Sequence, residues 1–124
     1  MAERQKRILV VEDERPMAKA LELKLSKEGF LAESASNGED ALTMLGQDPY
    51  DLVLLDLVMP KLDGFKVLER MHAAKHTMPV FILSNLGQEE DRKRAKQLGA
   101  REFFIKSDIP IADVVSHIKH VLHE

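Results

Sequence analysis

Side chains that can do chemistry follow directly after four short apolar runs of the sequence. They are Glu12–Asp13–Glu14 after Ile8–Val11, Asp56 after Leu52–Leu55, Ser84–Asn85 after Val80–Leu83, and Lys106 after Phe103–Ile105. If these runs are neighbouring strands, three or four carboxylates converge, and they can all be ionised only with the help of a cation. Oxygen-only ligands favour a hard cation such as Mg²⁺. Carboxylates with Mg²⁺, a hydroxyl and a lysine are the groups needed to bind a transferring phosphoryl group.

Asp56 is the best candidate for a nucleophile in this set. Its apolar run predicts the most central strand, and a carboxylate can itself form an aspartyl phosphate. An acid that closes a buried strand is costly unless it is used or paired. The other residues have simpler interpretations, because the acids at 12–14 and Ser84 can cap helices and Lys106 can be a surface lysine. The conjunction at four strand ends favours phosphoryl chemistry.

The elements that must position these residues alternate along the chain. Strands are predicted at Ile8–Val11, Leu52–Leu55 and Val80–Leu83, with more exposed ones at Leu31–Ala35 and Glu102–Ile105. Helices are predicted between Pro16 and Gly29, behind a Ser36-x-x-Glu39 capping box, over Gly64–Ala74 and Gln88–Leu98, and from Pro110 to Leu122. The helix over 88–98 has a thin apolar face, essentially Ala95 and Leu98, so it should pack lightly. Five strand–helix units predict an α/β fold with helices on both faces of a parallel sheet and a ligand site beyond the carboxyl ends of the strands.

Composition limits the classes of protein that need to be considered. The 124 residues fit one domain, which we expect to span 1–124, and the net charge of −3 argues against a nucleic-acid footprint. The absence of cysteine excludes disulfides and thiolate chemistry and fits a reducing, cytoplasmic location. No apolar run approaches the length of a membrane span or a signal peptide.

With these motifs together, the chain resembles the receiver domain of two-component response regulators (the CheY-like superfamily), from about Arg7 to about Leu122. The matching segments are Ile8-Leu-Val-Val-Glu-Asp-Glu14, Asp51-Leu-Val-Leu-Leu-Asp-Leu-Val-Met-Pro-Lys-Leu-Asp-Gly64, Ile82-Leu-Ser84 and Phe103-Phe-Ile-Lys106. The second is the most specific, because Asp56, Met59–Pro60 and Asp63–Gly64 keep the family's spacing together. The resemblance implies a three-layer, doubly wound, flavodoxin-like fold with five strands in the order 2-1-3-4-5 and five helices.

The resemblance also implies a role for each site residue. Asp56 would accept a phosphoryl group from a phosphohistidine on a sensor histidine kinase or phosphotransfer protein. Asp13, Asp56 and the Val58 backbone carbonyl would bind Mg²⁺, with Glu12 acting mainly through a bound water. Lys106 would pair with one phosphoryl oxygen and Ser84 would donate its hydroxyl to another. Phe103 holds the aromatic switch position, which is expected to turn inward with Ser84.

Four positions depart from the family pattern. Glu12 replaces the more usual aspartate, and Asn85 stands where a small residue is general, so its side chain could narrow access to the site. Ser107 replaces the proline after Lys106, so the family's cis peptide cannot be assumed. Phe103 has no hydroxyl and can switch only through packing.

The implied partners are proteins. In this family the segments equivalent to 88–98, 102–105 and 111–122 commonly form the surface that a downstream protein binds. We expect no direct nucleic-acid contact, no membrane association and no output domain within 124 residues, and we leave phosphorylation-dependent homodimerisation open. The chain is expected to assist its own phosphorylation and dephosphorylation without being an enzyme in the ordinary sense.

The lifetime of the phosphoryl group depends on two apolar positions. Val58 and Leu86 lie two residues beyond Asp56 and Ser84, where their side chains should overhang the phosphoryl group. Neither can orient a water molecule, so the sequence predicts slow self-dephosphorylation.

Other classes fit the motifs less well. A flavodoxin needs a hydroxyl- and glycine-rich loop where the acids at 12–14 stand, a dehalogenase-type hydrolase needs an acid at Val58, and no P-loop motif occurs. A receiver-like scaffold that is not phosphorylated is the main alternative, because Asn85 and Ser107 are unusual. The histidine spacings at His72/His76 and at His117, His120 and His123 can bind zinc, although surface positions near helix ends explain them more simply.

Overall fold

The computed structural model describes residues 5–123 and contains the predicted parallel sheet. Its five strands lie in the order β2-β1-β3-β4-β5 and are β1 (Arg7–Val11), β2 (Leu31–Ala35), β3 (Leu52–Leu55), β4 (Val80–Ser84) and β5 (Glu102–Ile105). The helices are α1 (Arg15–Lys27), α2 (Gly38–Gln47), α3 (Gly64–Ala73), α4 (Glu89–Gln97) and α5 (Ile111–Leu122). The predicted fold class, strand order and number of elements are confirmed.

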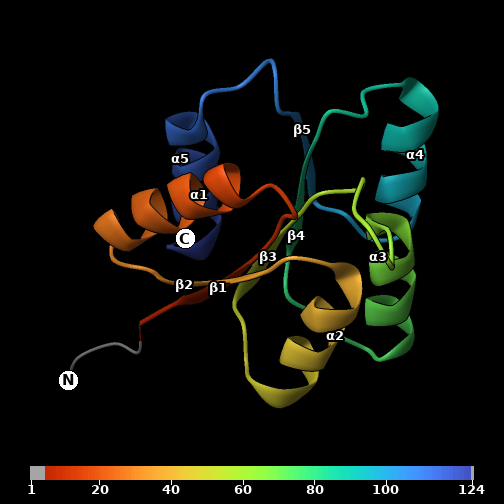
Figure 1. The fold of residues 1–124 in the computed structure, drawn as a ribbon, viewed down its shortest axis with the longest axis horizontal. Coiled ribbons are helices and arrows are strands. Elements are labelled where there is room, and N and C mark those ends of the chain that lie inside the picture. Colours follow the sequence, from red (N-terminus) through yellow and green to blue (C-terminus); the bar gives the residue numbers. More distant parts are fainter. Residues whose placement is uncertain (1–4, 124) are drawn as a thin grey trace.

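The sheet separates two layers of helices. Helices α1 and α5 cover one face, and α2, α3 and α4 cover the other (Figure 1). Successive residues of the central strands alternate between the two core regions, so Leu54 packs on the α1/α5 side while Val53 and Leu55 pack on the α2/α3/α4 side. All four residues of β3 are buried, whereas β2 and β5 at the edges are more exposed, as the sequence predicted.

The start of α2 corrects one prediction. The sequence predicted a capping box from Ser36 to Glu39, but the N-cap residue is Asn37, whose side chain accepts a hydrogen bond from the Asp40 N–H at 2.9 Å. The Asn37 amide also donates to the Asp40 carboxylate at 3.0 Å. Both Ser36 and Asn37 are good N-cap residues, and the helix begins one residue later because Asn37 forms both bonds.

The predicted light packing of α4 is confirmed. Only Ala95 of this helix is buried, and Leu98, just beyond its end, is partly buried. In the described part of the chain, no helix combines the length and the apolar character that crossing a membrane requires.

Candidate functional site

The predicted site residues at the carboxyl ends of the strands are positioned by backbone hydrogen bonds to neighbouring strands. The Glu12 N–H donates to the carbonyl of Ala35 at 3.0 Å, and the Asp56 N–H donates to that of Val11 at 3.0 Å. The Lys106 N–H donates to the Ser84 carbonyl at 2.9 Å. These bonds continue the hydrogen-bonding pattern of the β-sheet one residue past the strands, so the backbone of the sheet positions the functional side chains.

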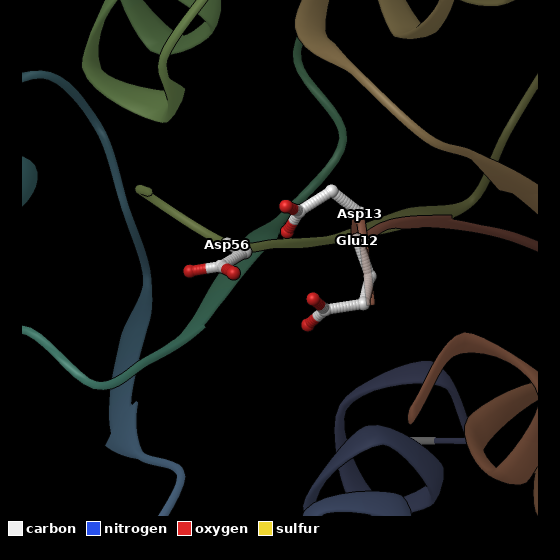
Figure 2. A group of neighbouring side chains, drawn as sticks. All are labelled: Glu12, Asp13 and Asp56. Carbon is white, nitrogen blue, oxygen red and sulfur yellow. The ribbon is translucent and has the colours of Figure 1, made fainter. Parts of the chain in front are cut away.

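Three carboxylates meet at this edge, as the sequence predicted. One oxygen from each of Glu12, Asp13 and Asp56 lies within 4.8 Å of the other two, and no other such group of potential metal ligands occurs in residues 5–123. Figure 2 shows the three side chains extending from the ends of β1 and β3 into the same region. Glu12 and Asp56 are buried, and Asp13 is more open to solvent. An oxygen-only cluster of this kind has the ligand chemistry that Mg²⁺ prefers.

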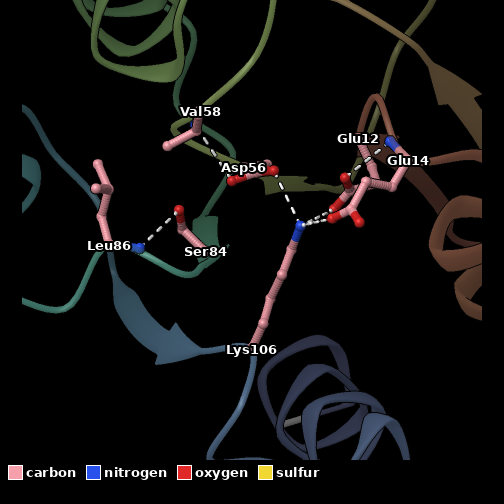
Figure 3. Close-up of polar contacts among 7 residues, drawn as sticks. All are labelled: Glu12, Glu14, Asp56, Val58, Ser84, Leu86 and Lys106. Atoms are coloured by element: carbon pink, nitrogen blue, oxygen red, sulfur yellow. Dashed lines mark hydrogen bonds and ion pairs between the residues drawn. The ribbon is translucent and has the colours of Figure 1, made fainter.

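Lys106 is the cation that balances this cluster. Its side chain is only 6% exposed; its Nζ donates to Glu14 Oε1 at 2.9 Å and to Asp56 Oδ2 at 3.0 Å, and it forms an ion pair with Glu12 Oε1 at 2.7 Å (Figure 3). The interpretation of Lys106 as a surface lysine is therefore wrong. The interpretation of the acids at 12–14 as helix caps also fails for Glu14, the N-cap residue of α1, whose side chain makes no cap hydrogen bond.

Burial and ion pairing act against each other on the pKa values of Glu12 and Lys106. Burial raises the pKa of Glu12 above its ordinary value, although hydrogen bonds from Lys106 and from the Glu14 N–H oppose the rise. Burial alone would lower the pKa of Lys106, but its hydrogen bonds to Glu12, Glu14 and Asp56 outweigh burial and the pKa is raised overall. Lys106 is consequently a permanent cation at neutral pH.

Asp56 faces an open cavity of about 370 Å³. The cavity is lined by Asp13, Glu14, Asp56, Val58, Asn85, Leu86 and Lys106. Asn85 is among the lining residues, which is consistent with the expectation that its side chain narrows access. A charged small group can reach Asp56 here from solvent.

The loop after β3 supports Asp56 from the other side. The Val58 N–H donates to Asp56 Oδ1 at 3.2 Å, and the Gly64 N–H donates to the Leu57 carbonyl at 3.0 Å. A Cβ atom at Gly64 would lie 2.4 Å from the Asp56 carbonyl oxygen, so only glycine allows this close return of the chain. Asp63 then begins α3 by accepting the Lys66 N–H at 3.0 Å. The Asp63–Gly64 pair thus sets the path of the loop that carries Val58.

Among the described residues, Ser84 forms no hydrogen bond with the carboxylates, and Phe103 lies on β5, three residues before Lys106. Ser84 is fully buried at the end of β4, and its Oγ accepts the Leu86 N–H at 3.4 Å. Phe103 is partly buried on the α2/α3/α4 side, with the Arg92 guanidinium 5.1 Å from its ring centroid. The described residues contain no cis peptide bond, so the Lys106–Ser107 bond is trans.

Comparison with known proteins decides the family. A family model of the response regulator receiver domain matches residues 8–119. The chain belongs to the response regulator receiver family. Among curated proteins, this receiver is 36% identical over 120 residues to the probable transcriptional regulator ycf27 of Guillardia theta. The aligned residues are 97% of this chain and 46% of that relative. It is 32% identical over 116 residues to the transcriptional regulatory protein PcoR of Escherichia coli. Here the aligned residues are 94% of this chain and 51% of the relative.

These two relatives are regulators by name, and the chain spans about half of the length of each. Solved structures of receivers cover nearly the whole chain. The signal receiver domain of a signal transduction histidine kinase from Syntrophus aciditrophicus is 30% identical with a TM-score of 0.85, covering 95% of this chain and 90% of that one. The receiver domain of the Francisella response regulator 1452 is 25% identical with a TM-score of 0.88, covering 94% and 95%.

Sequence reasoning missed one member of this receiver's site. The sequence places Glu14 among the converging acids but gives it no role beside Lys106, yet its carboxylate contacts Lys106, which lies 92 residues away. The contact depends on side-chain direction at the start of α1, for which the sequence carried no signal beyond the run of three acids.

Proposed function

We propose that this chain is a single receiver domain, residues 1–124, in which Asp56 accepts a phosphoryl group from the phosphohistidine of a sensor histidine kinase or phosphotransfer protein. The observation that carries the proposal is a buried carboxylate at the end of the central strand that faces an open cavity beside Lys106. We further propose that it works in the cytoplasm, the compartment expected for a chain without cysteine.

The chemistry is a transfer between two nucleophiles. An oxygen of the Asp56 carboxylate forms the new P–O bond while the P–N bond to the donor imidazole breaks, and the imidazole leaves with the bonding electron pair. Negative charge on the phosphoryl oxygens is offset by the Lys106 ammonium and by the buried Ser84 hydroxyl, which turns from Leu86 to donate to an oxygen. The Val58 N–H keeps the Asp56 carboxylate oriented.

The carboxylate cluster fits Mg²⁺. Glu12, Asp13 and Asp56 offer only oxygen atoms, and these lie close enough to share one ion. Asp13, Asp56 and the Val58 backbone carbonyl would hold the ion, with Glu12 acting through water. When bound, Mg²⁺ would supply positive charge that offsets the carboxylates and the phosphoryl oxygens.

The output would be a change in a protein-binding surface. Movement of Ser84 toward the phosphoryl group would open space for Phe103, which lies on β5. We propose the α4–β5–α5 surface as the docking site for a downstream protein. Phosphorylation-dependent homodimerisation is a second use of the same surface. We propose no contact with nucleic acid within this chain.

The phosphoryl group should be lost slowly. Val58 is 55% exposed, and both Val58 and Leu86 line the cavity over Asp56 with side chains that cannot orient a water molecule. Val58→Asn or Leu86→Gln should speed hydrolysis of the phosphorylated protein. Leu23→Asn, at an exposed position on α1, is the control. Unchanged decay in both cavity variants would contradict this prediction.

Phosphorylation is tested by mass spectrometry of the intact protein after incubation with acetyl phosphate and Mg²⁺. The wild type should gain one phosphoryl mass and Asp56→Asn none. Asp63→Asn is the matched control, because asparagine also caps a helix and the variant should be labelled like the wild type. Equal labelling of wild type and Asp56→Asn would contradict the role of Asp56. Labelling of neither would favour the unphosphorylated scaffold.

A further inference from the structure

The ammonium group of Lys106 is surrounded by three carboxylates in this structure. Two of its three N–H donors go to Glu14 and Asp56, at 2.9 and 3.0 Å, and Glu12 forms an ion pair with the same nitrogen at 2.7 Å. Figure 3 shows the three contacts converging on the one nitrogen. A new acceptor for Lys106 must therefore compete with carboxylates that already surround the ammonium group.

The free-energy cost of losing the contact with Lys106 differs among the three carboxylates. The side chains of Glu12 and Asp56 are 2% and 5% exposed, so removing their cation would leave a buried charge without compensation. The side chain of Glu14 is 60% exposed, and water can replace the ammonium there at little cost. Glu14 is the partner that is released most easily.

The backbone of Glu14 is held independently of that side-chain contact. Its N–H donates to Glu12 Oε2 at 3.0 Å, and its carbonyl accepts the Ala18 N–H at 3.0 Å in the first turn of α1. Release of the Glu14 carboxylate therefore moves a side chain without disturbing the helix. The contact can open and close as a local event.

We propose that Glu14 is a positioning residue that holds Lys106 in the unphosphorylated state and competes with the phosphoryl group for it. This inference rests on the proposed function, in which Lys106 pairs with a phosphoryl oxygen. The incoming oxygen takes the N–H that Glu14 gives up, and Glu12 and Asp56 keep their contacts with the ammonium group. The displaced carboxylate also removes a negative charge from the mouth of the cavity, which Glu14 lines.

The competition is measured with beryllofluoride, a phosphoryl mimic, at Mg²⁺ concentrations that saturate each variant. Glu14→Gln should bind beryllofluoride about 1.5- to 5-fold more tightly than the wild type, the range that corresponds to an exposed ion pair. Because the chain has no tryptophan, calorimetry or NMR is the suitable readout.

Glu39→Gln is the matched control. It removes the same charge at the start of α2, at the same end of the sheet, from an exposed side chain with no ion pair in the described part of the chain. Its affinity for beryllofluoride should stay close to that of the wild type. Equal gains in the two variants would show a general effect of charge and would overturn the proposal.

A second readout follows Lys106 without any phosphoryl mimic. In ¹⁵N–¹H spectra, the side-chain ammonium protons of Lys106 should exchange faster with water in Glu14→Gln than in the wild type or Glu39→Gln. Unchanged exchange, or weaker beryllofluoride binding by Glu14→Gln, would overturn the competition. Failure of the wild type itself to bind beryllofluoride would contradict the proposed function and, with it, this inference.

Discussion

Helices α4 and α5 flank the same edge strand, β5, but they are attached to the sheet in different ways. Helix α5 buries Val114, Val115 and Ile118 against the α1/α5 side of the sheet, whereas α4 buries only Ala95 against the other side. Ion pairing adds to the difference, since Lys119 of α5 pairs with Glu28, beside the end of α1, at 2.7 Å.

Helix α4 is held largely by two arginine–aromatic contacts. The Arg92 guanidinium lies 5.1 Å from the ring centroid of Phe103 on β5, and that of Arg94 lies 4.2 Å from the ring of Phe65 on α3. Arg94 also lies 3.8 Å from Glu69. An arginine–aromatic contact stabilises the folded state by about 0.5–1 kcal/mol at an exposed site. Burial of one large apolar side chain contributes about 1.5–3 kcal/mol.

This difference in packing indicates that α4 can be displaced at a lower cost in free energy than α5 when the site changes. Displacing α5 would expose three branched side chains, whereas displacing α4 would expose one buried methyl group and break the three surface contacts of Arg92 and Arg94. Phe103 and Ala95 belong to the same core region, and Arg92 of α4 lies over the Phe103 ring, so a turn of Phe103 would reach the weakly attached helix. We therefore expect the response to phosphorylation to move α4 against a fixed α5.

Truncation in α5 should produce the largest effect. Ile118 is fully buried, and Ile118→Ala should lower the free energy of unfolding by about 2–5 kcal/mol, since it removes buried methyl groups and leaves a cavity. Urea unfolding followed by circular dichroism measures the loss. A loss below that of the α4 variant described next would reverse the comparison.

Truncation in α4 should cost less. Ala95→Gly should lower the free energy of unfolding by about 1 kcal/mol plus the small contribution of one buried methyl group. Ala20→Gly, at an exposed position in α1, is the control for intrinsic helix propensity. The difference between the two variants, measured by the same urea titration, gives the packing contribution of α4.

Loss of the arginine contacts should loosen α4 selectively. Arg92→Gln and Arg94→Gln should each lower stability by no more than about 1 kcal/mol, and glutamine keeps the helix propensity nearly unchanged. Hydrogen exchange of the α4 amides should become faster while that of α5 stays the same. Lys93→Gln, at an exposed position that contacts no ring in the described residues, is the control. Equal acceleration in both helices would contradict the separate attachment of α4.

The Lys119–Glu28 pair should give the smallest effect, and one that depends on pH. The pair lowers the pKa of Glu28 below its ordinary value of 4.5, chiefly through the hydrogen bond from Lys119. A lowered folded-state pKa means that the stabilisation is present above pH 4.5 and is lost as the pH falls through the folded-state pKa. Lys119→Gln should therefore be slightly less stable than the wild type at neutral pH and equal to it in acid. A difference that persists in acid would assign it to lost packing instead.

The sequence predicted the parts of the site that the backbone fixes. Glu12, Asp56 and Lys106 follow apolar runs directly, and a parallel sheet brings the ends of such runs together whatever the details of packing. The thin apolar face of α4 was predictable for a similar reason, because the spacing of apolar residues sets how much of a helix can be buried.

What could not be predicted depends on the direction of single side chains. Ser36 and Asn37 are both good N-cap residues, and only the hydrogen bonds of Asn37 with Asp40 decide where α2 begins. The contact between Glu14 and Lys106 joins residues 92 positions apart. Arg92 and Arg94 contact aromatic rings, but in the sequence they belong to a run of charged residues that is typical of any solvent-exposed helix face. Long polar side chains have many rotamers, so their partners follow from the folded surface and not from periodicity.

The central claim, that Asp56 carries the phosphoryl group, is tested most directly by locating the modification. Borohydride reduction of an aspartyl phosphate gives homoserine, which peptide mass spectrometry can place within the sequence. After reaction with acetyl phosphate and Mg²⁺, we expect homoserine at position 56 alone. Homoserine at Asp13 or Asp63, or at no position of a correctly folded protein, would contradict the account.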